Sequence, residues 1–161
     1  MFHRYTHAAV VALAVMAGSA ASAQADVSKG VISAFRGQIV VTKDELPAGK
    51  NDKDSITKIK GARLTELTGT AQEDVTYWQF HYTAFLTKTG ASALKLEFYT
   101  NDKAKKYVAD KQLDGVDPKS AVLTGDISIN EDEGLAKGKS YIVKLIAGSN
   151  SAVATTTLKM K

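Results

Sequence analysis

The clearest hydrophobic pattern in the chain is an alternation over residues 74–88, DVTYWQFHYTAFLTK. One set of alternate positions is apolar: Trp78, Phe80, Tyr82, Ala84 and Leu86. The other set is mixed: Tyr77, Gln79, His81, Thr83 and Phe85. A period of two with many aromatic and β-branched residues predicts a strand with one face in the core.

Shorter patterns of the same kind predict strands at about 38–42, 94–99, 107–113, 120–130 and 140–148, and a last one in SAVATTTLKMK. Polar residues with Pro and Gly at 47–55 predict a loop. The segment 56–70 is ambiguous, because Ile56 and Ile59 are three apart, as are Leu64 and Leu67. It fits a short helix or a helical turn followed by a strand, and we favour a turn at 55–60 and a strand at 63–68. Seven or eight short strands without helix–strand alternation predict an all-β sandwich.

The stretch GLAKGKSYIVKL, residues 134–145, joins two of the late strands. Leu135 is placed to fill the core, Gly138 to allow a tight turn, and Tyr141 opens the next strand. This L-x-x-G-x-x-Y-x-V-x-L spacing resembles the tyrosine-corner pattern of immunoglobulin-like and fibronectin type III-like domains. The resemblance implies an immunoglobulin-like β-sandwich of seven or eight antiparallel strands, in which the Tyr141 hydroxyl bonds to backbone a few residues upstream.

Two further positions fit the resemblance. Trp78 resembles the buried tryptophan of strand C, and Leu64 stands where antibody domains have their first cysteine. Both cysteines of antibody domains are absent here, since the chain contains no cysteine. The resemblance therefore concerns architecture and names no functional family.

The first 25 residues read as a cleaved signal peptide. Arg4 precedes a short apolar stretch, Ala8 to Met16, and small residues with A-x-A sites follow. The alternative is a short buried helix of the folded domain. We therefore expect a signal peptide at 1–25, one sandwich domain at 26–161, and a periplasmic or secreted protein, with the alanine-rich leader suggesting a bacterial one.

Charge adds little to this interpretation. The chain has 21 Lys and Arg against 17 Asp and Glu, a formal net charge of +4. The lysines are scattered and interrupted by acids, which favours solubility over nucleic-acid binding. A second long apolar run is lacking, so no membrane span is expected in the mature chain.

The residues offer little catalytic chemistry. His81 is the single histidine after position 25, and with no cysteine a zinc site is not expected. The G-x-S-x-G elbow and phosphate-binding glycine motifs are missing, so we assign no catalytic residue and no cofactor. Calcium binding by the acidic segment 126–133 stays open, although it does not match the EF-hand loop.

One surface suggests a function. The mixed face with Tyr77, Gln79, His81 and Phe85 is unusually aromatic for a solvent side, and Tyr99 and Tyr107 on the next hairpin could join it. We expect an exported, non-catalytic module that recognises a protein or a carbohydrate through this face or through loops. The alternatives are packing of this face under residues 47–55 or against the second sheet, an assembly module that pairs through an edge strand, and a hydrolase with an unrecognised site.

Overall fold

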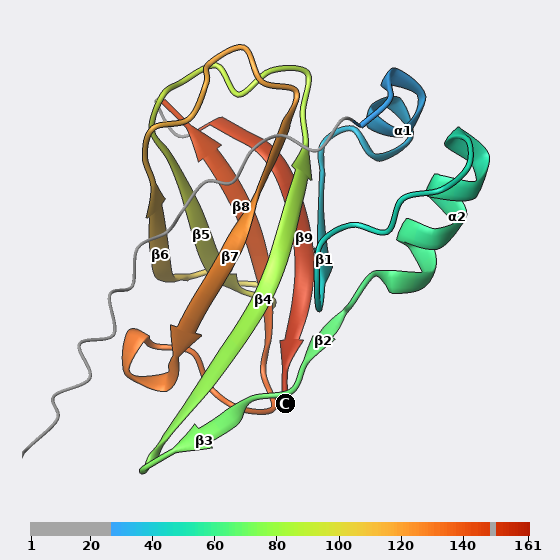
Figure 1. The fold of residues 1–161 in the computed structure, drawn as a ribbon. Helices are drawn as coiled ribbons and strands as arrows, with labels where there is room; N and C mark the ends of the chain where they lie inside the picture. The colour runs from blue at the N-terminus through green and yellow to red at the C-terminus, as the bar shows by residue number, and fades with distance from the viewer. Residues whose placement is uncertain (1–26, 149–150) are drawn as a thin grey trace, which may run out of the picture.

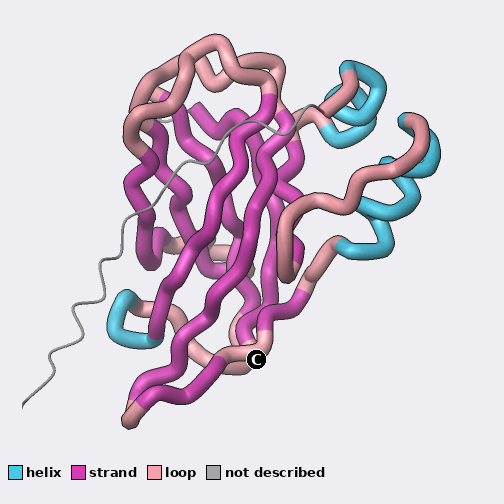
Figure 2. The backbone as a smooth tube through the Cα atoms, viewed as in Figure 1, coloured by secondary structure: helices cyan, strands magenta, loops and turns pink. Residues whose placement is uncertain are grey.

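The computed structural model describes residues 27–148 and 151–161, so the predicted signal peptide lies outside the described residues. Helices and strands follow one another along the chain as drawn in Figures 1 and 2. They are α1 (Lys29–Phe35), β1 (Gln38–Thr42), α2 (Asp52–Ala62), β2 (Glu66–Leu67), β3 (Thr70–Gln72), β4 (Val75–Phe85), β5 (Leu94–Thr100), β6 (Tyr107–Leu113), β7 (Val122–Asn130), the 3-10 turn η1 (Glu131–Glu133), β8 (Ser140–Ala147) and β9 (Ser151–Met160). The expectation of a mostly-β fold is confirmed.

The strands form one curled, mixed sheet. Its path runs β3-β4-β1-β9-β8-β5-β6, while β7 pairs with β4 and β2 pairs with β9. Most neighbours are antiparallel, but β1 and β2 both run parallel to β9. Because the sheet curls, β4 and β7 face β5, β6 and β8 across a shared core (Figure 1).

This core is built from the alternate positions of the strands. Trp78 of β4, Leu96 of β5 and Leu145 of β8 are each fully buried in it. The indole Nε1 of Trp78 donates a hydrogen bond to the carbonyl oxygen of Lys161, 3.2 Å away. Gly125 of β7 lies opposite Tyr82, and a Cβ there would come within 3.2 Å of the Tyr82 ring. This glycine therefore makes room for an inward-facing ring, and no bulge is needed to explain it.

The sequence did not predict α1, while α2 corresponds to the short helix that stood as the alternative for 56–70. The predicted turn at 55–60 and strand at 63–68 are wrong, since α2 occupies the first segment and only Glu66–Leu67 of the second is strand. The Asn51 side chain caps α2 by accepting from the Asp54 amide at 3.0 Å, and two acidic residues in the first turn suit the helix dipole. The loop expected at 47–55 therefore ends at Asn51, and residues 52–55 belong to α2. Neither described helix has the length and apolar character needed to cross a membrane.

The two helices pack over Phe85 at the end of β4, on the side of the strand that points away from the main core. Phe35 of α1 packs on Phe85 of β4 with ring centroids 5.2 Å apart. Ile59 of α2 joins them, and Val40 and Val122 complete a second buried cluster. Among the residues that the structure describes, two hydrophobic clusters therefore lie on opposite sides of the same strand.

The turn before β8 is held by a tyrosine hydroxyl. The Ala136 amide donates to the hydroxyl oxygen of Tyr141 at 2.8 Å, and both Leu135 and Tyr141 are buried. Gly138 has a φ of 81°, a left-handed conformation that glycine adopts without strain, and its amide donates to the Met160 carbonyl at 2.7 Å. Leu64 lies between α2 and β2 and belongs to no strand, so it does not occupy the strand position that the resemblance implied.

Replacing Tyr141 by phenylalanine should lower the free energy of unfolding by about 1–3 kcal/mol, because the Ala136 amide loses its acceptor in a partly buried turn. Urea denaturation of the purified domain measures the change. Tyr107→Phe is the control, since it removes a hydroxyl from an exposed ring. Equal unfolding midpoints for Tyr141→Phe and the unmodified protein would contradict a stabilising role for this bond.

Candidate functional site

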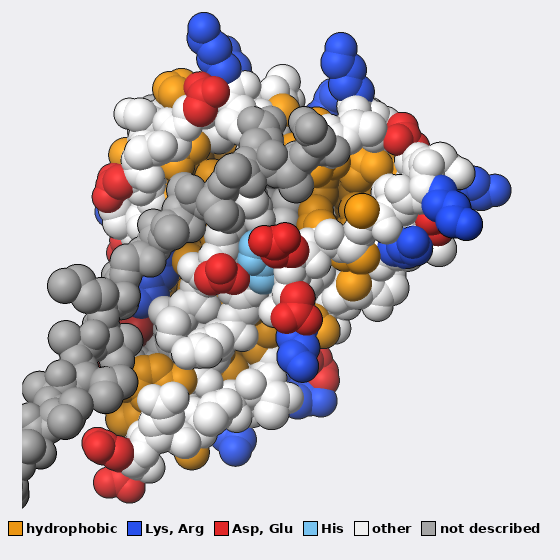
Figure 3. Space-filling model, in the orientation of Figure 1, with side chains coloured by type: hydrophobic (Ala, Val, Ile, Leu, Met, Phe, Trp, Pro, Cys, Tyr) orange, Lys and Arg blue, Asp and Glu red, His pale blue; other side chains and the backbone are white. Residues whose placement is uncertain are grey.

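The structure divides the mixed face of β4 into two parts. Tyr77 is half-buried and Gln79 is exposed, whereas His81, Thr83 and Phe85 are buried. Phe85 lies under α1, so it is not available to a ligand. Figure 3 views this side of the molecule and shows a small histidine surface between acidic side chains, with hydrophobic surface toward the helices. The expected continuous aromatic face is therefore not present on β4.

His81 takes part in a hydrogen-bonded network between β4 and β7. Its Nδ1 lies 2.9 Å from Oδ1 of Asp126, and its Nε2 lies 2.6 Å from Oγ1 of Thr124. The ionised carboxylate of Asp126 can only accept, so Nδ1 of His81 donates to it, and the Thr124 hydroxyl is the hydrogen-bond partner of Nε2. Sequence reasoning found His81 but not its partners, because finding them requires the register that sets His81 opposite Asp126.

The order carboxylate, imidazole, hydroxyl is also that of a catalytic triad. Here, however, accessibility is reversed, because the Asp126 side chain is 84% exposed while Thr124 and His81 are buried. The Thr124 oxygen also lies 3.1 Å from the carbonyl of Tyr82, within the sheet face. A nucleophile must reach its substrate, so we interpret the network as hydrogen-bond partners for buried polar groups.

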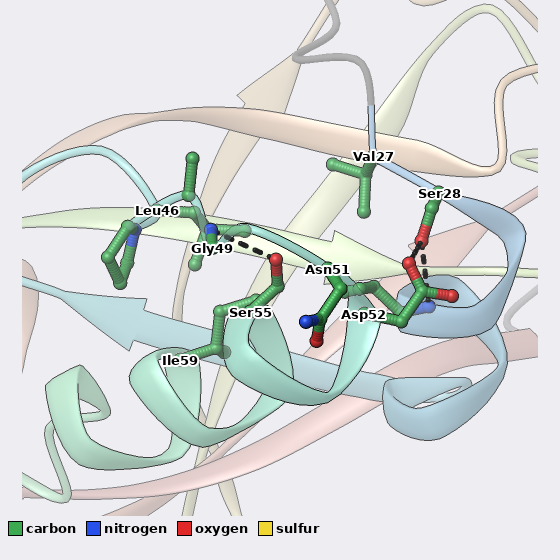
Figure 4. A pocket seen from close by; sticks show the side chains of 11 residues that line it. Val27, Ser28, Leu46, Gly49, Asn51, Asp52, Ser55 and Ile59 are labelled. Atoms are coloured by element: carbon green, nitrogen blue, oxygen red, sulfur yellow. Dashed lines mark hydrogen bonds between the residues drawn. The ribbon is translucent and has the colours of Figure 1, made fainter.

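A pocket of about 240 Å³ lies between α1, α2 and the segment before α2 (Figure 4). Its lining is mainly apolar and includes Val31, Leu46 and Ile59. At its edge the Ser28 hydroxyl donates to Asp52 at 2.6 Å and accepts from the Val31 amide at 3.3 Å. Among the described residues no lysine, arginine or histidine lines this pocket, and Ser28 caps α1 and ties it to α2 through Asp52.

The acidic segment 126–133 uses its carboxylates within the fold. Glu131 accepts a hydrogen bond from the Thr76 amide at 3.0 Å, and Glu133 forms an ion pair with Lys111. The Asn130 side chain accepts from the Glu133 amide at 3.2 Å. Within residues 27–148 and 151–161, no three His, Cys, Asp or Glu side chains gather in a way that could hold a metal ion.

A second polar and aromatic surface lies on β5, β6 and β8, and we call it the tyrosine face. It consists of Tyr99 and Tyr107, whose rings meet edge to face with centroids 6.0 Å apart, together with Glu97, Asp110 and Lys144. Tyr107 is 54% exposed, and no other large hydrophobic side chain is exposed among the residues that the structure describes. The Lys144 ammonium lies over the Tyr99 ring, 4.2 Å from its centroid.

Each tyrosine of this face is oriented by a carboxylate. The Tyr99 hydroxyl donates to Glu97 at 2.5 Å, and the Tyr107 hydroxyl donates to Asp110. The hydrogen bond to Asp110 raises the pKa of Tyr107 to about 12, and that to Glu97 raises the pKa of Tyr99. Both rings are therefore neutral phenols at physiological pH, held in fixed directions beside charged groups.

The tyrosine face is separate from Tyr77. β4 and β5 both send side chains into the main core, so their outward-facing residues point to opposite sides of the molecule. Tyr99 therefore does not join Tyr77, Gln79 and His81 in one surface. It pairs with Tyr107 in the β5–β6 hairpin, and the two rings lie side by side.

Comparisons with known proteins leave the family open. No protein-family model and no curated protein matches the chain. Among solved structures, a β-glucosidase from Kluyveromyces marxianus matches with a TM-score of 0.33 and 12% sequence identity, covering 60% of this chain. The match spans only 14% of that enzyme, and a similarity this weak carries no argument about activity.

Thr124→Val should lower the free energy of unfolding by about 1–3 kcal/mol, because Nε2 of the buried His81 loses its hydrogen-bond partner. Chemical denaturation measures the change, with Thr157→Val on the exposed side of β9 as a matched control. If both variants unfold at the same denaturant concentration, the network does not contribute to stability.

Asp110→Asn should lower the pKa of Tyr107 from about 12 toward the ordinary value of 10.0, because the carboxylate favours the protonated phenol. The ¹³Cζ chemical shift of labelled tyrosine, followed by NMR between pH 8 and pH 13, reports this titration. Glu97→Gln is the control and should move Tyr99 more than Tyr107. An unaltered Tyr107 titration in Asp110→Asn would show that the hydrogen bond does not persist in solution.

Proposed function

We propose that this chain is a non-catalytic binding module that recognises a carbohydrate through the tyrosine face. The observation that carries the proposal is the exposure of Tyr107 beside Tyr99 on a rigid pair of strands. An exposed aromatic ring loses little conformational freedom on binding, since its side chain has only two rotatable bonds and its hydroxyl is already fixed by Asp110.

The chemistry of the face suits a sugar ring. The apolar C–H side of a sugar stacks on an aromatic ring such as Tyr107, while its hydroxyl groups need donors and acceptors at the rim. Glu97 and Asp110 supply carboxylate acceptors, and Lys144 supplies an ammonium donor. Such a surface needs no deep pocket, which agrees with its position on the outside of a sheet.

We also propose that the curled sheet is an immunoglobulin-like sandwich. The hydrogen bond from Ala136 to Tyr141 supports this, as does the core shared between β4 and β5, whereas the parallel pairing of β1 with β9 departs from the all-antiparallel pattern that the resemblance implied. A signal peptide at 1–25 would bring the domain to the periplasm or the cell exterior, where polysaccharides are available. The leader pattern described above supports that location.

Tyr107→Ala should weaken carbohydrate binding at least tenfold, because stacking on one ring contributes about 1.4 kcal/mol or more. Binding of the mature domain to an array of neutral and acidic glycans identifies ligands, and titration calorimetry then measures affinity. Tyr77→Ala is the matched control, since it removes a tyrosine from the opposite side of the molecule.

Three results would overturn the proposal. The first is a wild-type domain that retains no glycan on the array. The second is a Tyr107→Ala variant that binds the same glycans with unchanged affinity. The third is an equal loss for Tyr77→Ala, which would move the working surface to β4.

A further inference from the structure

Lysines gather at one end of the tyrosine face. Lys103, Lys105 and Lys106 lie in the loop between β5 and β6, immediately before Tyr107, and all three are exposed. The Asn101 amide donates to the Ser140 carbonyl at 3.1 Å, which brings this loop against the turn before β8. That turn adds two more exposed lysines, Lys137 and Lys139. We call these five residues the lysine end.

The β5–β6 loop is ordered by one carboxylate. Oδ1 of Asp102 accepts from the Thr100 hydroxyl at 2.9 Å and from the backbone amides of Ala104 and Lys105 at 2.9 and 3.0 Å. The Thr100 hydroxyl oxygen in turn accepts from the Lys106 amide at 2.9 Å. These hydrogen bonds, that from Thr100 foremost, lower the pKa of Asp102. The lysine backbone is therefore already in place before a ligand arrives, which reduces the entropy lost on binding.

The charges of the lysine end are largely uncompensated. None of its five ammonium groups lies within 4 Å of a carboxylate among the described residues. Two lysines of the β5–β6 hairpin, by contrast, are paired, Lys95 with Asp110 and Lys111 with Glu133. Asp102, Glu131 and the exposed Asp132 are the acids near this end, since Glu133 of the same 3-10 turn is paired with Lys111. Five lysines against three acids leave a net positive charge beside the exposed Tyr107 ring.

We infer that the ligand of the tyrosine face is an acidic polysaccharide, one whose sugar rings carry carboxylates. This inference rests on the proposed carbohydrate function and adds the ligand's charge to it. A sugar ring stacks on Tyr107, and carboxylates of neighbouring units lie over the lysine end. Ammonium groups on flexible stems suit this task, because they follow the irregular spacing of charges along a polymer.

The face also gives the ligand a direction. Glu97 and Asp110 lie on the side of the tyrosines away from the loop, since they precede Tyr99 and follow Tyr107 along their strands. Asp110 is paired with Lys95 at 3.8 Å, but the carboxylate of Glu97 repels an anionic sugar, while Lys103, Lys105 and Lys106 attract one. The polymer is therefore expected to leave the tyrosines toward the loop.

The test compares two forms of one probe by titration calorimetry. The first is a hexasaccharide of galacturonic acid, and the second is the same hexasaccharide with its carboxylates methyl-esterified. Wild type should bind the acid form at least tenfold more tightly than the ester, with affinity that falls as salt rises. The triple variant Lys103→Gln/Lys105→Gln/Lys106→Gln should lose about tenfold for the acid form, at roughly 0.5 kcal/mol per exposed contact.

A matched triple variant controls for net charge. Lys43→Gln/Lys50→Gln/Lys53→Gln removes the same three charges from exposed positions near α2 and should bind like wild type. If both triple variants lose the same affinity for the acid form, the effect is one of net charge and the inference is overturned.

Equal affinity of the wild type for acid and ester, abolished by Tyr107→Ala, would overturn the inference while supporting the carbohydrate function. Binding of neither form, or acid binding that Tyr107→Ala leaves unchanged, would overturn the inference and the tyrosine face together. Tighter binding of a single-stranded oligonucleotide than of the acid form would also overturn it.

Discussion

Strand β4 must be covered on both faces, and most of the structure follows from that requirement. Every residue from Phe80 to Leu86 is buried, although their side chains alternate between two sides. In an antiparallel sheet, a strand commonly packs one side on the core and exposes the other side to water. Here the curl of the sheet covers the side of Trp78, while on the other side α1 and α2 cover Phe85, and His81 and Thr83 bond to side chains of β7.

Burial of the second side also fixes how β7 is placed. That side carries His81 and Thr83 as well as Phe85, and buried polar groups must find hydrogen-bond partners. Thr124 and Asp126 provide them, and they do so only in the register that sets Asp126 opposite His81. A shift of one residue would turn these partners toward the main core. The polar network thus specifies the alignment of two strands that apolar packing alone would leave less defined.

The sequence predicted strands well and the arrangement around them poorly. The alternation at 74–88 and the hairpin around Asn101 were visible because a period of two depends only on neighbouring residues. The sequence did not predict α1, since it has only seven residues, and a helix at α2 was the less favoured alternative, since α2 shows no strong apolar stripe and Ile59 is its one buried side chain. The tyrosine face could be predicted in part. Tyr99 and Tyr107 are conspicuous in the sequence. Their separation from Tyr77 depends on the curl of the sheet, which places β4 and β5 on opposite sides of the core, and the sequence pattern does not show that curl.

The parallel contact between β1 and β9 has a consequence for how the molecule reaches its folded state. The last strand lies inside the sheet, with β8 on one side and β1 and β2 on the other, and the indole of Trp78 bonds to the carbonyl of Lys161. Strand β9 therefore links β8 on one side of the core to β1 and β2 on the other, and Lys161 is bonded to β4 through Trp78. Pairings between such distant segments close large loops before they gain contacts, which slows folding. During synthesis β1, β2 and β8 are made before β9, so they cannot form their contacts with it. We therefore expect the sheet to stay incomplete until β9 has been made.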